Sequence, residues 1–102
     1  MSRIITQPKL AGETVKMVFD FTSRLAAAET ISTQNVAASV YSGTDASPSA
    51  VVSGAATASG AQVTQTLTGG VAGVIYKLVA TITTSLSKTL QLSTFMAVVP
   101  DL

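Results

Sequence analysis

Few residues in this 102-residue chain are suited to chemistry, and they are scattered. The chain has no histidine and no cysteine, which removes the commonest general base and the usual zinc ligands. The acidic residues are Glu13, Asp20, Glu29, Asp45 and Asp101, and no two of them are spaced so that their carboxylates must lie close together. We therefore expect no metal site, no cofactor and no enzymatic activity.

Two short motifs have the spacing of active-site sequences but lack the features that accompany them. Ser85-Leu86-Ser87-Lys88 matches the Ser-x-x-Lys spacing of acyl-serine enzymes, which also need a second lysine motif and a larger fold with a pocket. The glycine-rich segment 69–73 opens no helix and is not followed by the Lys-Ser or Lys-Thr of a phosphate loop. Both motifs are predicted to be turns.

The composition limits the possible partners. Only 11% of residues are charged and the formal net charge is +1, with no cluster of lysine and arginine for a phosphate backbone, so nucleic acid is not expected. No apolar run has the roughly 18–20 residues of a membrane helix, and the first residues lack the apolar core of a signal peptide. Between Thr30 and Tyr76 the only charged residue is Asp45. Such a neutral surface fits a protein held inside an assembly, although a well-hydrated monomer is the alternative.

The segment 67–82 carries the clearest structural pattern. Gly69, Gly70 and Gly73 allow a tight reversal, and a long alternating strand follows from Tyr76. A leucine, a turn and then a tyrosine opening a strand are typical of the corner of an immunoglobulin-like or fibronectin-like sandwich. There the hydroxyl bonds back to the backbone of the corner. We expect Tyr76 to be buried, with its hydroxyl bonded near Leu67 to Val71.

Alternation of apolar and polar residues predicts the other strands. A bulge or a break is expected near Gln34-Asn35, one short helical turn within 22–29, and a short edge strand at Ala50–Val52 inside a mobile connection. The chain is predicted to form an extended arm over residues 1–12 and one antiparallel β-sandwich of six or seven strands over residues 13–102. The further strands are expected at Thr14–Phe21, Thr30–Tyr41, Ala61–Thr68 and Lys88–Val99.

Four stretches together resemble the small tailed-phage proteins that serve as fiber–tail adaptors or virion accessory proteins. They are Val18–Leu25, Glu29–Ser32, Gly69–Tyr76 and Ile82–Ser85, which match an aromatic-Asp-aromatic strand, an "ETI" segment, a "GGxAGxxY" corner and an "ITTS" hairpin. The sequence departs from the pattern at Phe21 and Arg24, where tryptophan is common, and at Ser87, where the hairpin has glycine.

The resemblance implies a non-enzymatic structural protein of a phage particle, made in the host cytoplasm. It implies an adaptor at the neck or tail that holds a fiber, or a capsid cement protein. The expected partners are portal, neck, tail, fiber or capsid subunits and further copies of the chain. A sandwich that binds carbohydrate or a cell surface is the alternative from another class, with Tyr41 beside Asp45 as its one candidate site.

Apolar residues that the predicted core does not use form the candidate interface. Phe95 and Val99 lie on the outer face of the last strand and Leu86 at a hairpin tip, while the arm contributes Ile4, Ile5 and Leu10. Several exposed apolar residues beside a charge-poor surface suggest docking. In the alternative, the arm of the same chain covers Phe95.

Overall fold

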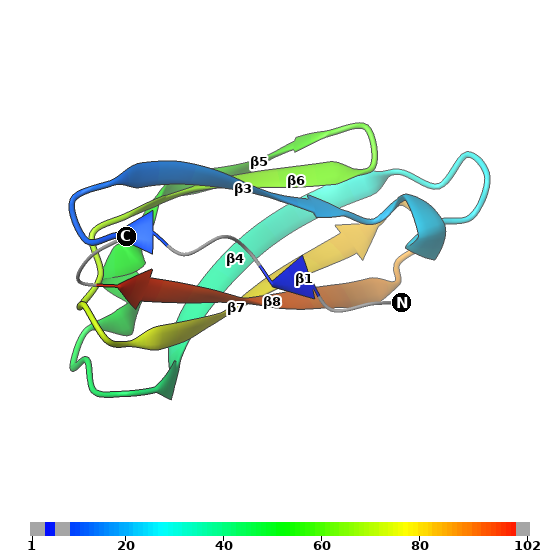
Figure 1. Ribbon diagram of the computed structural model, residues 1–102. Helices are drawn as coiled ribbons and strands as arrows, with labels where there is room; N and C mark the ends of the chain where they lie inside the picture. Colours follow the sequence, from blue (N-terminus) through cyan, green and yellow to red (C-terminus); the bar gives the residue numbers. More distant parts are fainter. Residues whose placement is uncertain (1–3, 6–8, 100–102) are drawn as a thin grey trace.

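The structure, a computed structural model, describes residues 4–5 and 9–99, and it is a sandwich of two facing sheets (Figure 1). One sheet has the order β3-β6-β5 and the other the order β1-β8-β7-β4, with β2 also paired to β8. The longer strands pair with one another in antiparallel fashion. The longer strands are β3 (Thr14–Asp20), β4 (Ile31–Ser42), β5 (Val52–Ser59), β6 (Gln62–Thr68), β7 (Ile75–Thr84) and β8 (Thr89–Val99). The expected all-β sandwich is confirmed, and the immunoglobulin-like subtype stays a prediction.

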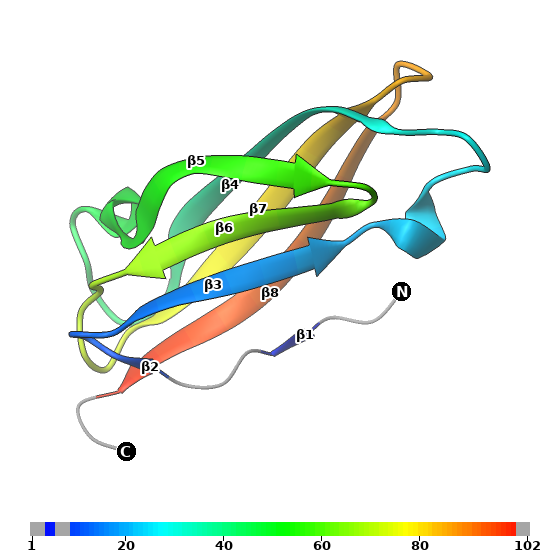
Figure 2. The same ribbon diagram turned by 90° about the horizontal axis from the view of Figure 1, so that it is seen from above.

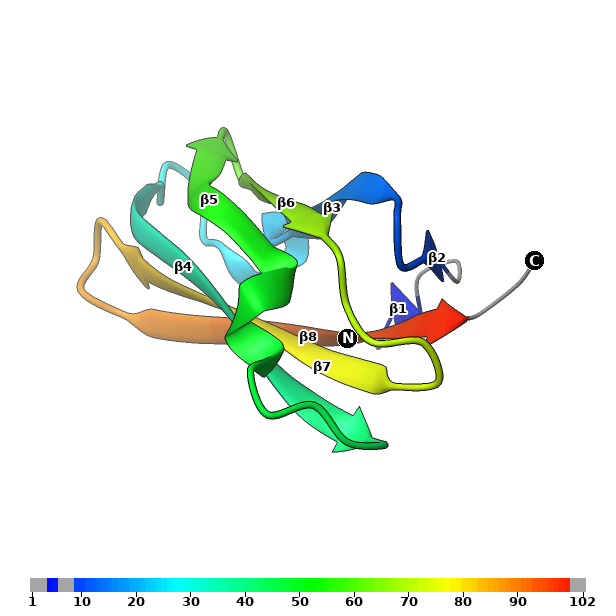
Figure 3. The same cartoon turned by 90° about the vertical axis from the view of Figure 1, so that its left-hand side faces the viewer.

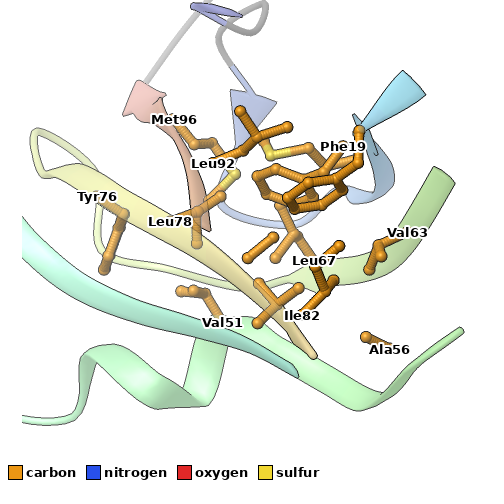
Figure 4. Close-up of a cluster of buried hydrophobic side chains, with 14 of the residues drawn as sticks. Phe19, Val51, Ala56, Val63, Leu67, Tyr76, Leu78, Ile82, Leu92 and Met96 are labelled. Atoms are coloured by element: carbon orange, nitrogen blue, oxygen red, sulfur yellow. The ribbon is translucent and has the colours of Figure 1, made fainter. Parts of the chain in front are cut away.

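The core lies between the two sheets, where each strand contributes alternate side chains. In β7 the alternation is nearly strict, and Tyr76, Leu78 and Ile82 are fully buried. Figure 4 shows these side chains directed toward those of the facing sheet. Because the chain has no cysteine, no disulfide can stabilise the fold, and the packing of this core must do so. The main core residues are Phe19, Phe21, Val51, Val63, Leu67, Tyr76, Leu78, Ile82, Leu92, Met96 and Val98.

The first half of β4 is more regular than the sequence predicts. Gln34 and Asn35 pair in regular register with Ile82 and Thr81, so the expected bulge or break does not fall at these two residues. The register shifts instead near the two ends of the strand, between Ile31 and Thr33 and between Val40 and Ser42. The alternation around Gln34 is weak because β4 is an edge strand. Most of its polar residues are exposed, so they need not alternate strictly with buried apolar residues.

The connection from β4 to β6 is more ordered than expected. Instead of a short piece at Ala50–Val52, it contains a 3₁₀ turn, η2 (Pro48–Val51), and the strand β5. With η1 (Thr22–Arg24) this makes two short helical turns in the described residues, where one was expected. The small residues of β5 show little alternation of apolar and polar side chains. The strand nevertheless pairs with β6 at both ends, through Val52 and Ser53 and through Thr57 to Ser59.

The N-terminal arm lies along its own sandwich where the structure describes it. β1 (Ile4–Ile5) pairs in parallel with β8 at Thr94 and Phe95, and β2 (Lys9–Leu10) pairs in parallel at Val98 and Val99. Figure 3 shows both short strands beside β8, at the side opposite β4. Residues 1–3 and 6–8 of the expected arm and the C-terminal residues 100–102 lie outside the described residues.

Candidate interaction surface

Tyr76 fixes the corner between β6 and β7. Its side chain is fully buried, and its hydroxyl accepts a hydrogen bond from the backbone N–H of Val71 at 2.8 Å. The same hydroxyl donates to Oδ2 of Asp45 at 2.6 Å. The expected bond from the tyrosine to its corner is therefore confirmed. The bond to Asp45 also ties this corner to the connection between β4 and β5.

Asp45 is oriented by its own turn. Its Oδ1 accepts from the backbone N–H of Ser47 at 2.8 Å, as in an Asx turn. The Tyr76 hydroxyl, followed by the Ser47 N–H, holds the pKa of Asp45 below its ordinary value of 3.8. Burial, with the hydrogen bond to Asp45 adding to it, raises the pKa of Tyr76 above 10.0. The corner therefore favours an ionised carboxylate beside a neutral phenol.

The glycines of the corner are not equivalent. All three of Gly69, Gly70 and Gly73 adopt positive φ, as the sequence predicts for a tight reversal. At Gly70 a Cβ atom would also lie 2.8 Å from Cγ2 of Val98 and 3.4 Å from the Tyr76 ring. At Gly69 and Gly73 nothing lies within 4 Å of that position. Gly70 is thus the glycine that lets the turn pack onto the core.

The proposed sugar site at Tyr41 and Asp45 is not assembled as one site. Both carboxylate oxygens of Asp45 accept hydrogen bonds within the corner, from Ser47 and from Tyr76. The Tyr41 ring instead packs on Phe95, with ring centroids 4.5 Å apart and planes inclined by 54°. Such a tilted contact is a favourable aromatic geometry. The carboxylate that a sugar site would use is already engaged in structure.

The outer face of the β4-β7-β8 sheet changes in character along its length. Toward the β7–β8 hairpin it is polar, and Nε2 of Gln91 donates to Oγ1 of Thr81 at 3.0 Å. Toward the other end it is apolar, and we call this region the outer apolar patch. Lys77, opposite Phe95 on the neighbouring strand, is the one charged residue on this face among the described strands. The patch consists of Tyr41, Ile75, Val79, Phe95, Ala97 and Val99.

Burial distinguishes the members of the patch. Tyr41 is 64% exposed, whereas Phe95 is half-buried. An exposed tyrosine ring resting on a half-buried phenylalanine is the kind of rigid aromatic surface that protein interfaces use. The sequence indicated Phe95 but missed Tyr41 as its neighbour. Its position on the same face could have been found only from the pairing of β4, β7 and β8.

The candidate interface residues fall into separate places. Phe95 and Val99 share the outer face of β8, and Leu10 is half-buried in β2 beside Val99. Ile4 and Ile5 lie in β1 next to Thr94 and Phe95, and their side chains are outside the description. Leu86 is 59% exposed at the hairpin tip. Phe95 lies six positions along β8 from Thr89, about 20 Å of strand, and Leu86 lies beyond Thr89, so Leu86 does not belong to the outer apolar patch.

The hairpin tip that carries the Ser-x-x-Lys motif is a structural turn. Oγ of Ser85 accepts from the backbone N–H of Thr30 at 3.1 Å. Lys88 instead pairs with the buried carboxylate of Glu29 at 3.2 Å. The N–H of Ala26, with Lys88 contributing, holds the pKa of Glu29 below its ordinary value. The two motif residues thus serve to dock the hairpin onto the loop before β4.

Residues 4–5 and 9–99 contain no group of three acidic, histidine or cysteine side chains that could ligate a metal ion. No helix among them is long and apolar enough to cross a membrane.

These features define a class: a small all-β sandwich whose buried polar groups hold its corners and whose β4-β7-β8 sheet has an outer face with a single charged residue, Lys77. The sequence model of one family, the podophage GP4 fiber-tail adaptor protein gp77 family, matches residues 9–97. The chain belongs to this family, and it is therefore a structural adaptor of a phage tail. No curated protein and no solved structure matches the chain.

Proposed function

We propose that the protein joins a fiber to the tail at the neck of a podophage particle, and that protein–protein contacts alone hold it there. The family match over residues 9–97 carries this proposal. The low charge of the surface supports it, because interface cores are depleted in charged residues. The role requires only a rigid body with binding surfaces.

The outer apolar patch is the contact surface that the geometry favours. Tyr41 and Phe95 present a preformed aromatic pair, which loses little conformational entropy when a partner covers it. The half-buried aliphatic residues around it supply apolar area, and Lys77 offers a single charge for a partner carboxylate. The exposed Leu86 at the hairpin tip is a second and separate contact point.

Particles assembled with variant protein test the role of the patch. Tyr41→Ser combined with Phe95→Ser should reduce the amount of the protein in purified virions and the number of attached fibers. Val18→Ser, at a 47% exposed position on β3 of the other sheet, is the matched control and should incorporate normally. The Tyr41→Ser single variant should lose incorporation in part and melt like wild type, because its side chain is exposed.

Two outcomes would refute parts of the proposal. If the double variant melts like wild type and incorporates normally, the patch is not the contact surface. If particles that lack the protein altogether carry their full set of fibers, the adaptor role at the neck is wrong. Mass spectrometry of virions against culture supernatant then locates the protein, and presence only in the supernatant favours a free binding module.

A further inference from the structure

The edges of the two sheets are protected unequally. An open edge presents unpaired N–H and C=O groups that invite another strand, and proteins protect such edges with covers, charges or bulges. The β8 edge is covered by β1 and β2. The β3 edge carries the exposed charges of Lys16 and Asp20. The β5 edge is interrupted by a register shift between Ser53 and Thr57, with Gly54 at positive φ.

Where the structure describes it, the central part of the β4 edge has no covering strand, no charged residue and no bulge. Among the residues that the structure describes, β4 pairs with β7 alone and ends its sheet. Its sequence from Ile31 to Ser42 contains no charged residue and no proline. The register is regular from Thr33 to Val40, because the irregularities lie only at the two ends. The open stretch is thus regular in register, neutral and long enough for a second strand.

The facing sheet contacts β4 without pairing with its backbone. Figure 2 shows β4 and β5 along one long side of the molecule, with β3, β8 and the described arm strands along the other. The polar link from β4 to β5 runs through a side chain, Nε2 of Gln34, which donates to the carbonyl oxygen of Ala56 at 3.2 Å. Among the described residues the backbone of β4 pairs with β7 alone, so the N–H and C=O groups of its outer edge are available to a partner strand.

We propose that β4 pairs antiparallel with β4 of a second copy of this chain, so that the two β8-β7-β4 sheets continue across a two-fold axis. The centre of the strand favours this occupant. Ala37, Ala38 and Ser39 are small, so two backbones can approach without a clash. A neutral strand also meets its own copy without like-charge repulsion, which an isologous interface would otherwise place directly opposite itself. This pairing does not depend on the adaptor role.

The register has a symmetric centre at Ala37. When two copies of a strand pair antiparallel about a two-fold axis perpendicular to the sheet, one residue must lie opposite its own copy. Only then do core-facing residues of one copy pair with core-facing residues of the other. The middle of the regular stretch from Thr33 to Val40 falls between Val36 and Ala37. Ala37 is exposed and lies on the outer face, opposite Val79 of β7, so it is the position to test.

The first experiment measures the mass of the full chain in solution as its concentration rises. We expect a dimer for wild type and a monomer for Ala37→Lys, because two lysines would face each other across the axis. Thr57→Lys, at an exposed outer position of β5, is the matched control and should remain a dimer. Mixing Ala37→Lys with Ala37→Glu should restore a dimer, which loss of folding in either variant could not produce.

The second experiment uses the absence of cysteine from the chain. Ala37→Cys should form a disulfide-linked dimer under mild oxidation, because opposed residues of paired strands bring their Cβ atoms within bonding reach. Thr57→Cys should not. A wild-type chain that stays monomeric up to about 1 mM would overturn the proposal. So would a dimer that Ala37→Lys leaves intact, including one built on β8 or on the outer apolar patch.

Discussion

At the scale of single residues, the contact between Tyr76 and Asp45 decides how the corner is held. The two residues are 31 positions apart, and no other charged residue lies in the segment 31–75 that contains Asp45. A buried phenol must find partners for its hydroxyl, because an unsatisfied polar group in a core is costly. Asp45 and the Val71 N–H provide both, so the one charge of the neutral middle segment has a structural use.

The hydroxyl of Tyr76 should therefore contribute measurably to stability. Tyr76→Phe keeps the ring but leaves the Val71 N–H and the Asp45 carboxylate without this partner. We expect a loss of about 1–2 kcal/mol in the free energy of unfolding, measured by urea titration. Tyr41→Phe is the control at an exposed position and should change it little. Equal stability of the two variants would contradict the role of the corner.

The ionisation of Asp45 should make part of the stability depend on pH. Its pKa is lowered in the folded state, so its contribution is present above its ordinary value of 3.8 and disappears as the pH falls through the lower folded value. Asp45→Asn should therefore differ most from wild type near neutral pH, and the difference should shrink in acid. Thermal melts between neutral pH and strong acid measure this. A difference that grows on acidification would contradict the assigned hydrogen bonds.

At the scale of elements, the β7–β8 hairpin stores strain in its turn. Ser87 adopts φ of 62°, a left-handed conformation that costs an L-residue roughly 1–2 kcal/mol relative to glycine. Its N–H donates to Thr84 O at 2.9 Å, and Thr84 N–H donates to Lys88 O at 2.8 Å, which fix this geometry.

Ser87→Gly should stabilise the protein. Relief of the strain outweighs the greater freedom of glycine in the unfolded chain, which costs roughly 0.5–1 kcal/mol, so a net gain of up to about 1 kcal/mol is expected. Ser39→Gly, in an exposed strand position without positive φ, is the control and should destabilise. The free energy of unfolding by urea checks both. A loss at Ser87→Gly would show that the turn carries no strain.

The turn between β6 and β7 allows a similar comparison of two glycines. Gly69→Ala and Gly70→Ala both force a side chain into positive φ, but only the second places its Cβ within 2.8 Å of Val98. Gly70→Ala should therefore lower the melting temperature more than Gly69→Ala. Scanning calorimetry of the two variants checks this order, and the reverse order would contradict the packing of the turn onto β8.

Sequence periodicity predicts the strands whose apolar and polar side chains alternate. It misses a strand that forms only because a neighbouring strand pairs with it. β3, β7 and β8 were predicted nearly in full because each buries alternate large residues. β5 consists of small residues that could suit a linker, and only its pairing with β6 makes it a strand. Gln65 was missed as a core residue, although it is buried and its Nε2 donates to the carbonyls of Ser53 and Gly54.

The same limit applies to the candidate surface. The outward position of Phe95 follows from alternation along β8, so the sequence could indicate it. Its contact with Tyr41 depends on a strand that is distant in sequence, and the engagement of Asp45 by Tyr76 depends on the connection between β4 and β5. Such contacts follow from tertiary arrangement, which local pattern does not encode.

At the scale of the whole molecule, protection of the β8 edge depends on the arm. β1 and β2 pair with β8 over two residues each, whereas the sandwich itself is held by long strands and one contiguous core. Because short terminal pairings are among the least stable parts of a fold, the arm should open before the sandwich does. The sequence boundary between arm and domain, near residue 12, is therefore expected to be a boundary in stability as well.

Removal of residues 1–10 tests this boundary. The sandwich should remain folded, with a melting temperature about 4–8 °C lower for each 1 kcal/mol that the arm contributes. The uncharged β8 edge, from Thr89 to Val99, would then be open, so association should increase with concentration. Ala37→Lys should not suppress this added association, because it acts at the opposite edge of the sheet. A truncated chain that fails to fold would show that the arm is part of the domain.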